Sequence, residues 1–560
     1  MIRYSVYLEI HPDGRTMAHI LALPGCISRA AAREEALRRL PGAVREYHAW
    51  LRRHGEPALP LDEPFDLEIS DESTGYGPFD PGNAAVLFPP DLAPVSADEV
   101  ECFTRLMGHA RADLLALVSD LPDEILDWQP DPQSLTLRRV LRHVGNAEEW
   151  YVSRIVPAEA LPPAWEHDEA LPIFEFLVME RRTAIERLAA LSDAERSQLF
   201  YPQRWTDHPD EPWTAAKVLR RFLEHEREHT GQVREILAAW RERLVVRLTL
   251  ERAGLLAQLT GLDERTLVER PVFDGWTAKD LLAHVATWDE FFTERIVVVL
   301  AGRQRALTTV HDQDAYNADL RAERRNWSLE RVLAACADAR AGFLQALAQV
   351  PDEAFHRRWQ DAWGESSFRL WTQWRAYHDA EHAGNVTAWR KTLGEQAQVT
   401  WHEVGPRSVL RASLRAHREA LLALIALVPP GERNTRPISG LWTLRDVVGH
   451  LADWEGLCVE VLRQMAAGEA IKVDYDGDVD AWNAAHAAAR QGQSWDAVWA
   501  DFEAARRAIL AVLDGLSDAD LNTSRDGDWG GTPYRWAYVC VDHDQEHMAD
   551  LRRAVMEEMS

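Results

Sequence analysis

The feature that most constrains this chain is an internal repeat in its C-terminal five-sixths. Three segments align with one another and each ends in a histidine: residues 135–143, 276–284 and 442–450. Each is followed later in the chain by two histidines with three residues between them: His225/His229, His378/His382 and His543/His547. Self-similarity of this kind is the signature of one structural unit used several times. The sequence therefore predicts three copies of one unit.

Each copy contains four amphipathic segments with the 3.6-residue period of a helix. One precedes the single histidine, one carries it, one follows, and the last carries the histidine pair. The first segment opens with Ser96 and Glu99, whose spacing is typical of a capping box. Four such helices in about 150 residues predict a four-helix bundle. We expect a mainly α chain of three tandem bundles, over residues 96–241, 242–398 and 399–560.

The N-terminal residues, 1–70, have a different pattern. Two apolar stretches flank the turn signal His11–Gly14, and the first alternates with polar residues as a strand does. The expected elements are strands near residues 4–9 and 17–23, a helix over 31–54 and a strand over 65–69. This order predicts a small α+β domain. Residues 71–95 are rich in glycine, proline and aspartate, and we expect a linker there.

Composition excludes some partners. The formal net charge of −28 disfavours binding to nucleic acid or to an anionic membrane, because both require a basic surface. The five cysteines are scattered and never form a C-x-x-C pair, which fits a reducing compartment. The N-terminus lacks the apolar core of a signal peptide, and no apolar run approaches the roughly 20 residues of a membrane span. We expect a soluble, cytoplasmic protein.

The histidines are spaced as metal ligands would be. Residues i and i+4 share one helix face, so both imidazoles of a pair can reach one ion, and the single histidine of another helix completes three ligands. Three protein ligands leave positions open for water or substrate. Imidazole suits Zn, Ni, Fe or Cu. The predicted sites, for up to three divalent metal ions per chain, are His143 with His225 and His229, His284 with His378 and His382, and His450 with His543 and His547.

Other interpretations of these histidines stay open. A lone histidine on an apolar helix face is commonly a core residue, and duplication could preserve a structural histidine in every copy. Residues 225–229 also match the H-E-x-x-H pattern of zinc proteases, in which Glu226 would be the general base. The other copies have Asp379 and Asp544 at that position, and the third candidate ligand lies upstream of the pair instead of downstream.

A glutamate precedes the second histidine of each pair. It could orient a ligand imidazole or serve as an acid–base group. It could equally be a charge on a solvated helix face that pairs with a nearby arginine. The candidate catalytic residues are Glu228, Glu381 and Glu546.

Copies two and three resemble each other more than either resembles the first. Both have Trp-Thr before the helix of the single histidine, and both have an Asp-Ala-aromatic-Asn element, at residues 314–317 and 480–483. The first copy has Leu135 in place of the tryptophan and lacks the asparagine. We therefore expect its pocket to differ.

Together, these elements over residues 96–560 resemble the DinB/YfiT-like superfamily of four-helix bundles. Gly231-Gln232 after the first pair resembles the family's ending, Gly384-Asn385 is a near variant, and the third copy departs from it with Ala549-Asp550. The resemblance implies that the three histidines of each copy bind a divalent metal. It also implies chemistry like that of thiol-dependent transferases and isomerases that use bacillithiol, mycothiol or glutathione.

The segment Tyr4–Gly55 resembles the HicB-like antitoxin domain. The matching features are a hairpin that ends in Leu23-Pro24-Gly25-Cys26, then Ser28, and a helix that opens with Glu34-Glu35-Ala36. The resemblance implies a small toxin ribonuclease as partner. The DNA-binding segment of that family has no counterpart here, so DNA binding is not expected. A scaffold reused for dimerisation or docking is the alternative.

Three functions follow from these observations. The first is a metal-dependent enzyme that acts on a small molecule by thiol transfer or hydrolysis, in detoxification, with a low-molecular-weight thiol as a candidate substrate. The second is a non-catalytic stress or self-protection protein that binds a metal or ligand. The third assigns the N-terminal domain to docking of a protein partner.

Overall fold

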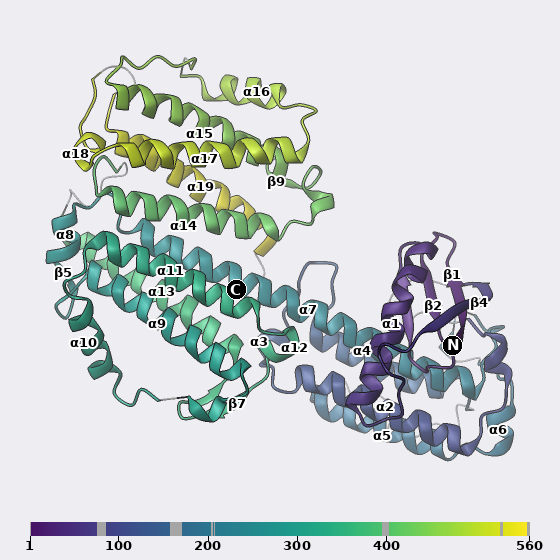
Figure 1. Ribbon diagram of the computed structural model, residues 1–560. Coiled ribbons are helices and arrows are strands. Elements are labelled where there is room, and N and C mark those ends of the chain that lie inside the picture. Colours follow the sequence, from purple (N-terminus) through teal and green to yellow (C-terminus); the bar gives the residue numbers. More distant parts are fainter. Residues whose placement is uncertain are drawn as a thin grey trace. The chain divides into compact units, whose positions relative to one another are not determined.

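The computed structural model describes residues 2–75, 86–156, 171–202, 205–206, 208–307, 309–394, 402–475, 477–526 and 530–556. It confirms the predicted fold class, a mainly helical chain of tandem bundles that follow a small α+β domain (Figure 1). The chain divides into two compact units, Met1–Ala238 and Ala239–Ser560. The first holds the α+β domain and bundle 1, and the second holds bundles 2 and 3. Among the described residues, no helix is both long and apolar enough to cross a membrane.

The α+β domain is a four-stranded sheet with the strand order β3-β2-β1-β4. Its elements are β1 (Ile2–Ile10), β2 (Thr16–His19), β3 (Ile27–Ala30), α1 (Arg33–Arg53) and β4 (Phe65–Thr74). The expectation of two strands before the helix is wrong, because β3 pairs antiparallel with β2. The buried face of β3 carries the small residues Ser28 and Ala30, so the strand lacks the alternation of large apolar and polar side chains that marks a strand in the sequence. Strand β4, parallel to β1, takes up the start of the segment expected to be a linker.

Bundle 1 is built from four long helices: α2 (Ala97–Val118), α4 (Leu137–Val152), α5 (Ile173–Ala189) and α7 (Ala215–Ala257). The short helices α3 (Asp123–Leu126) and α6 (Asp193–Ser197) lie in its connections. Ser96 and Glu99 form the expected capping box at the start of α2. Helix α7 is continuous through the predicted boundary between residues 241 and 242, so the last helix of bundle 1 is also the first helix of bundle 2.

Bundles 2 and 3 repeat this plan. Bundle 2 combines α7 with α9 (Ala278–Leu300), α11 (Leu329–Ala348) and α13 (Phe368–Thr392), and adds α8 (Glu264–Glu269), α10 (Gln313–Arg324) and α12 (Asp352–Phe355). Bundle 3 consists of α14 (Arg407–Ala426), α15 (Leu444–Ala467), α17 (Trp495–Gly515) and α19 (Pro533–Met556), with α16 (Val479–Ala489) and α18 (Asp518–Leu521). Apolar side chains of both bundles form one continuous hydrophobic cluster.

A short hairpin leads into the helix of the single histidine in bundles 2 and 3. In bundle 2 it consists of β5 (Pro271–Phe273) and β6 (Trp276–Thr277). Thr277 then caps α9 in a capping box with Asp280. Bundle 3 repeats the arrangement with β9 (Pro437–Ser439) and β10 (Trp442–Thr443). The repeated Trp-Thr element is thus the second strand of a hairpin and the cap of the following helix.

The α+β domain packs on α7 of bundle 1. Apolar side chains of both form one buried cluster. Polar contacts also join them, among them His19 Nδ1 at 2.8 Å from Glu224 Oε1 and Arg29 Nη1 at 3.1 Å from Glu228 Oε1. Gly25, with a φ of 88°, approaches α7 so closely that a Cβ there would lie 2.8 Å from Cδ of Arg227. The turn between β2 and β3 therefore requires a glycine for two reasons, its backbone conformation and this contact.

Candidate metal centres

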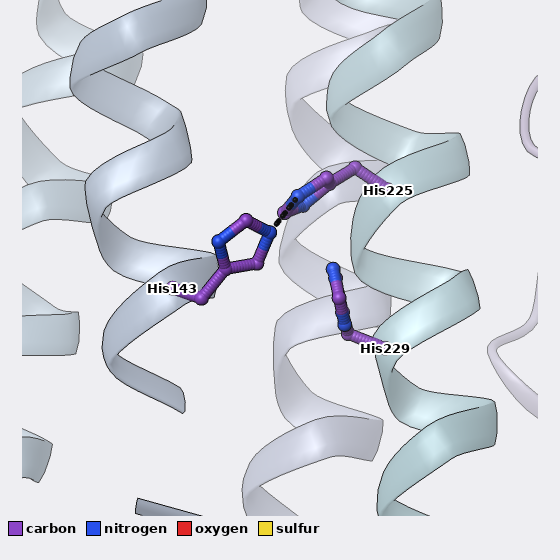
Figure 2. A group of neighbouring side chains, drawn as sticks. All are labelled: His143, His225 and His229. Atoms are coloured by element: carbon purple, nitrogen blue, oxygen red, sulfur yellow. Dashed lines mark hydrogen bonds between the residues drawn. The ribbon is translucent and has the colours of Figure 1, made fainter. Parts of the chain in front are cut away.

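Helices α4 and α7 bring the three predicted histidines of bundle 1 together. Figure 2 shows His143 on one helix facing His225 and His229, which lie on successive turns of its neighbour. The Nε2 atoms of His143 and His225 are 3.1 Å apart, and one ligand nitrogen from each of the three residues lies within 4.8 Å of the others. His143 is exposed and the other two are buried. Solvent therefore reaches the triad at His143.

The same arrangement recurs in bundles 2 and 3. In both, the first histidine of the pair is central, because its Nε2 lies close to the Nε2 atoms of the other two. The Nε2–Nε2 distances are 2.9 Å (His284–His378) and 3.1 Å (His378–His382) in bundle 2, and 2.8 Å (His450–His543) and 3.2 Å (His543–His547) in bundle 3. The structure thus brings each predicted set of three histidines together.

The donor atoms fit a divalent metal. Three imidazole nitrogens that bind one tetrahedral ion at 2.0–2.1 Å lie roughly 3.3 Å from one another, close to the spacings here. Nε2 of His229 is buried and has no hydrogen-bond partner among the described residues. A buried polar atom without a partner is costly, and a bound ion would satisfy it. The three residues of each triad could therefore hold one ion.

Burial keeps these imidazoles neutral. It lowers the pKa of His229, His382 and His450 to about 4, and that of His284 and His543 to about 3. Burial, followed by the charge of neighbouring groups, holds the pKa of His225 and His378 well below the ordinary value. Only a neutral imidazole has the free lone pair that binds a metal. Burial therefore favours the neutral form of these imidazoles near neutral pH, which metal binding requires.

A polar residue three positions after each pair contacts the last histidine. The Nδ1 atom of that histidine lies 2.8 Å from Oε1 of Gln232 in bundle 1, 3.4 Å from the amide nitrogen Nδ2 of Asn385 in bundle 2 and 3.5 Å from Oδ2 of Asp550 in bundle 3. An oxygen that accepts from Nδ1–H, as Gln232 Oε1 does in bundle 1, orients the ring and leaves Nε2 for the metal, whereas the amide nitrogen of Asn385 donates to Nδ1. This contact explains the repeated Gly-Gln and Gly-Asn endings. The departure in the third copy keeps a hydrogen-bond acceptor.

The Asp-Ala-aromatic-Asn element supplies a partner for the single histidine. It opens α10, where Asn317 hydrogen-bonds with His284 and accepts from the indole N–H of Trp288 at 3.2 Å. In bundle 3, Asn483 on α16 does the same for His450, with Trp454 Nε1 2.9 Å away. Bundle 1 has no such asparagine in its sequence. The predicted difference between the first copy and the others therefore lies in how the single histidine is oriented.

A buried ionic network, which the sequence did not reveal, joins the four helices of each bundle. The part common to all three bundles takes one charge from each helix, in the order Arg, acid, Arg, acid: Arg111, Glu148, Arg181 and Glu226; Arg252, Asp289, Arg340 and Asp379; Arg418, Glu455, Arg506 and Asp544. The acids stand at constant positions, five residues after the single histidine and directly after the first histidine of the pair. That spacing was the available signal. Burial of the arginines cannot be read from it.

The network explains the H-E-x-x-H match in bundle 1. Glu226 Oε1 accepts from Arg111 at 2.5 Å, and its Oε2 accepts from Arg181 at 2.6 Å. Both carboxylate oxygens are thus committed to buried arginines. Asp379 and Asp544 occupy the same place in their bundles. Glu226 is therefore a structural acid, and the protease interpretation loses its general base.

The three candidate catalytic glutamates lie in different surroundings. Glu228 is buried, with Arg29 of the α+β domain 3.1 Å from Oε1 and Arg221 3.7 Å from Oε2. Glu381 and Glu546 are exposed on α13 and α19. The equivalent position is thus an interdomain ion pair in bundle 1 and a solvated charge in bundles 2 and 3. Their acid–base role stays a prediction.

Space beside the triads also differs. A cavity of about 960 Å³ in bundle 2 is lined by His284 and His382, with Phe273 and Trp276 among its walls. In bundle 3 the cavity beside His450 measures about 20 Å³, little more than a water molecule needs. Bundle 2 can therefore hold a small molecule next to its triad as it stands.

Comparisons with known proteins agree with this architecture. The family model of the DinB superfamily matches three times, over residues 107–233, 247–386 and 413–551. The UPF0150 protein Ta0767 of Thermoplasma acidophilum is 29% identical over 68 residues, which cover 12% of this chain and 97% of that protein, and the N-terminal domain is HicB-like. No solved structure matches the chain significantly. Because the three matches span most of the sequence, the chain belongs to the DinB superfamily.

Proposed function

We propose that this protein is a metal-dependent enzyme that acts on a small molecule through its histidine triads. The observation that carries the proposal is the threefold recurrence of converging Nε2 atoms, with all ligand nitrogens of a triad within 4.8 Å. Three protein ligands leave coordination positions free. A divalent ion held there would lower the pKa of a bound water or thiol and so supply a nucleophile near neutral pH.

The chain's own residues contribute orientation and a binding space. The hydrogen bonds of Gln232, Asn385, Asn317 and Asn483 fix ring orientations, so the ligand atoms are preorganised. The cavity in bundle 2 offers the aromatic faces of Phe273 and Trp276 to an apolar part of a substrate. These features support thiol transfer or hydrolysis of a small, electrophilic compound, with a low-molecular-weight thiol as co-substrate.

Metal analysis of the full-length protein tests the proposal. We expect up to three ions per chain after loading with Zn²⁺, Ni²⁺ or Fe²⁺ and removal of free metal. Replacing both histidines of one pair by alanine, for example His543→Ala with His547→Ala, should remove one ion and leave the others. A variant with all three pairs replaced should hold none. Unchanged metal content in that variant would overturn the proposal.

The small cavity in bundle 3 favours a second function for that site, retention of a metal or ligand without turnover. A space of about 20 Å³ holds little more than one water molecule. The test uses a variant in which only the third triad is intact. Loaded with metal, this variant should keep its ion and consume neither a thiol nor an electrophile. Turnover of any compound by that variant would exclude this second function.

A further inference from the structure

The first histidine of the pair in bundle 2 has a partner that its equivalents lack. Arg375, one turn earlier on α13, places Nη1 2.8 Å from Nδ1 of His378. Its Nε donates to Asp289 Oδ1 at 2.8 Å, and its Nη2 donates to the carbonyl oxygen of Val285 at 3.2 Å. Arg375 is 2% exposed. Three hydrogen bonds and burial therefore fix the orientation of the guanidinium.

This contact decides which ring nitrogen of His378 carries the proton. A guanidinium only donates hydrogen bonds, so Nδ1 of His378 must accept. The proton of the neutral ring is then on Nε2. That atom faces Nε2 of His284 at 2.9 Å and Nε2 of His382 at 3.1 Å. The proton thus points into the space that an ion would take.

The other two triads lack this arrangement. The residue three positions before the first histidine is Phe222 in bundle 1 and Cys540 in bundle 3. Phenylalanine cannot donate a hydrogen bond, and a thiol is a weak donor. In the described ranges, no arginine hydrogen-bonds to His225 or His543. Nε2 of these two residues can be free of a proton without the loss of a charged hydrogen bond.

We propose that Arg375 makes the triad of bundle 2 the last of the three to take up metal. To bind an ion through Nε2, His378 must give up the proton there while its Nδ1 still accepts from Arg375, or the Arg375 contact must break. Either change carries a cost that the other triads do not bear. This inference rests on the proposed function, because it assumes that the triads bind metal at all.

The buried network suggests the variant that tests this. Arg375 is a fifth member, present only in bundle 2, and its removal leaves Asp289 and Asp379 with Arg252 and Arg340. That is the composition of two arginines and two acids found in bundles 1 and 3. Arg375→Met removes the donor and keeps an apolar chain of similar length. Arg375→Gln offers a side-chain oxygen that can accept from Nδ1–H, as Gln232 does for His229.

The experiment titrates the full-length, metal-free protein with Zn²⁺ against a competing chelator. We expect two ions to bind tightly and a third at least tenfold more weakly, and we expect His378→Ala with His382→Ala to remove only the weak step. Arg375→Met and Arg375→Gln should tighten the third step about tenfold or more. The matched control is Arg340→Met, which removes an arginine of the same network that touches no histidine, and it should not tighten that step.

The possible results distinguish the role of Arg375 from metal binding by the triads. Three equal affinities in the native protein, or a third step that neither Arg375 variant tightens, would overturn the role of Arg375 and leave metal binding intact. Failure of every triad to bind would overturn the proposed function itself. Amide hydrogen exchange in α9 and α13 monitors folding of bundle 2 in the variants, because the two tight ions lie in the other bundles. Arg375→Gln provides the reading if Arg375→Met unfolds bundle 2.

Discussion

Helices α7 and α13 share an inner face and differ on the outer one. Toward the bundle, both carry the histidine pair and the buried acid that follows its first member. On the outside, α7 has Arg221 and Glu224, both buried, and Glu224 contacts His19 of the α+β domain. At the same positions α13 has Trp374 and Tyr377, 39% and 65% exposed. The repeated unit therefore keeps what builds the triad and varies where another domain packs.

The difference shows how closely the α+β domain is tied to bundle 1. Buried charges are tolerated only where partners satisfy them. Glu224 accepts from Arg220 at 2.9 Å and from Arg221 at 2.7 Å, but its other oxygen faces His19 of the α+β domain. Without that domain, this face of α7 would lose a partner and its apolar cover. We therefore expect the α+β domain and bundle 1 to fold as one unit.

We expect the largest effect from a substitution that disrupts the interface between the α+β domain and α7. Glu224→Ala leaves His19, Arg220 and Arg221 buried without their shared acceptor. Removing one partner of a buried charged group costs about 3–5 kcal/mol. Faster amide hydrogen exchange in β2 and α7, with unchanged exchange in bundle 3, would report the loss.

The equivalent position in bundle 2 provides the control. Tyr377→Ala removes an exposed side chain, so exchange in bundle 2 should stay as it is in the native protein. Equal losses from the two variants would show that the outer faces of α7 and α13 are not different in the way described.

A second contrast between the bundles concerns pH. Glu180 on α5 is 3% exposed and its Oε2 has no hydrogen-bond partner among the residues that the structure describes, whereas the equivalent residues of the other copies are Ala339 and Ala505. Burial, reinforced by Glu149, raises the pKa of Glu180 from 4.5 to about 8. The unfolded chain releases this proton above pH 4.5, and the folded chain keeps it to about pH 8. Bundle 1 should therefore lose stability between these values.

Glu180→Gln removes this titration. It should stabilise bundle 1 by roughly 3 kcal/mol at pH 7 and by almost nothing at pH 4.5. The difference in unfolding free energy between the native protein and the variant is measured by urea unfolding at pH 5, 6 and 7, with hydrogen exchange in α5 as the probe. A gain of the same size at all three pH values would mean that packing, and not the proton, is responsible.

The bundles and triads could be predicted because both produce a periodic pattern in the amino-acid sequence. Helical amphipathicity repeats every 3.6 residues, and the i, i+4 spacing places two histidines on one face in every copy. No sequence pattern distinguishes the arginines of the network, since Arg181 and Arg340 look like any other arginine in an amphipathic helix. Their partners lie on three other helices, and only the packed bundle shows the pairing. Strand β3 was missed because its buried residues, Ser28 and Ala30, are small and give no apolar alternation. The continuity of α7 was missed because nothing in the sequence marks where one bundle's helix passes into the next.

A smaller effect would sharpen the distinction between bundle 1 and the other two. Asn317→Ala and Asn483→Ala remove the partner that holds His284 or His450. Loss of such a contact typically lowers metal affinity 10–100-fold. We expect the lower end, about tenfold, because the other two histidines keep their positions. Chelator competition should show one weakened ion per variant, and an unchanged affinity would assign the Trp–Asn pair to packing alone.

We expect the smallest effects from substitutions of the three glutamates that precede the second histidine of each pair, and these effects should differ between the bundles. Glu381→Gln and Glu546→Gln change exposed charges, so neither stability nor metal content should change measurably. Glu228→Gln should loosen the contact with Arg29 and speed exchange in β3, because only bundle 1 uses this position to hold another domain. If Glu381→Gln instead abolishes turnover while its metal stays bound, the solvated glutamate acts on the substrate. The equivalent position would then have two roles: an acid–base group in bundle 2, and in bundle 1 an ion pair in which Arg29 shields the carboxylate from solvent.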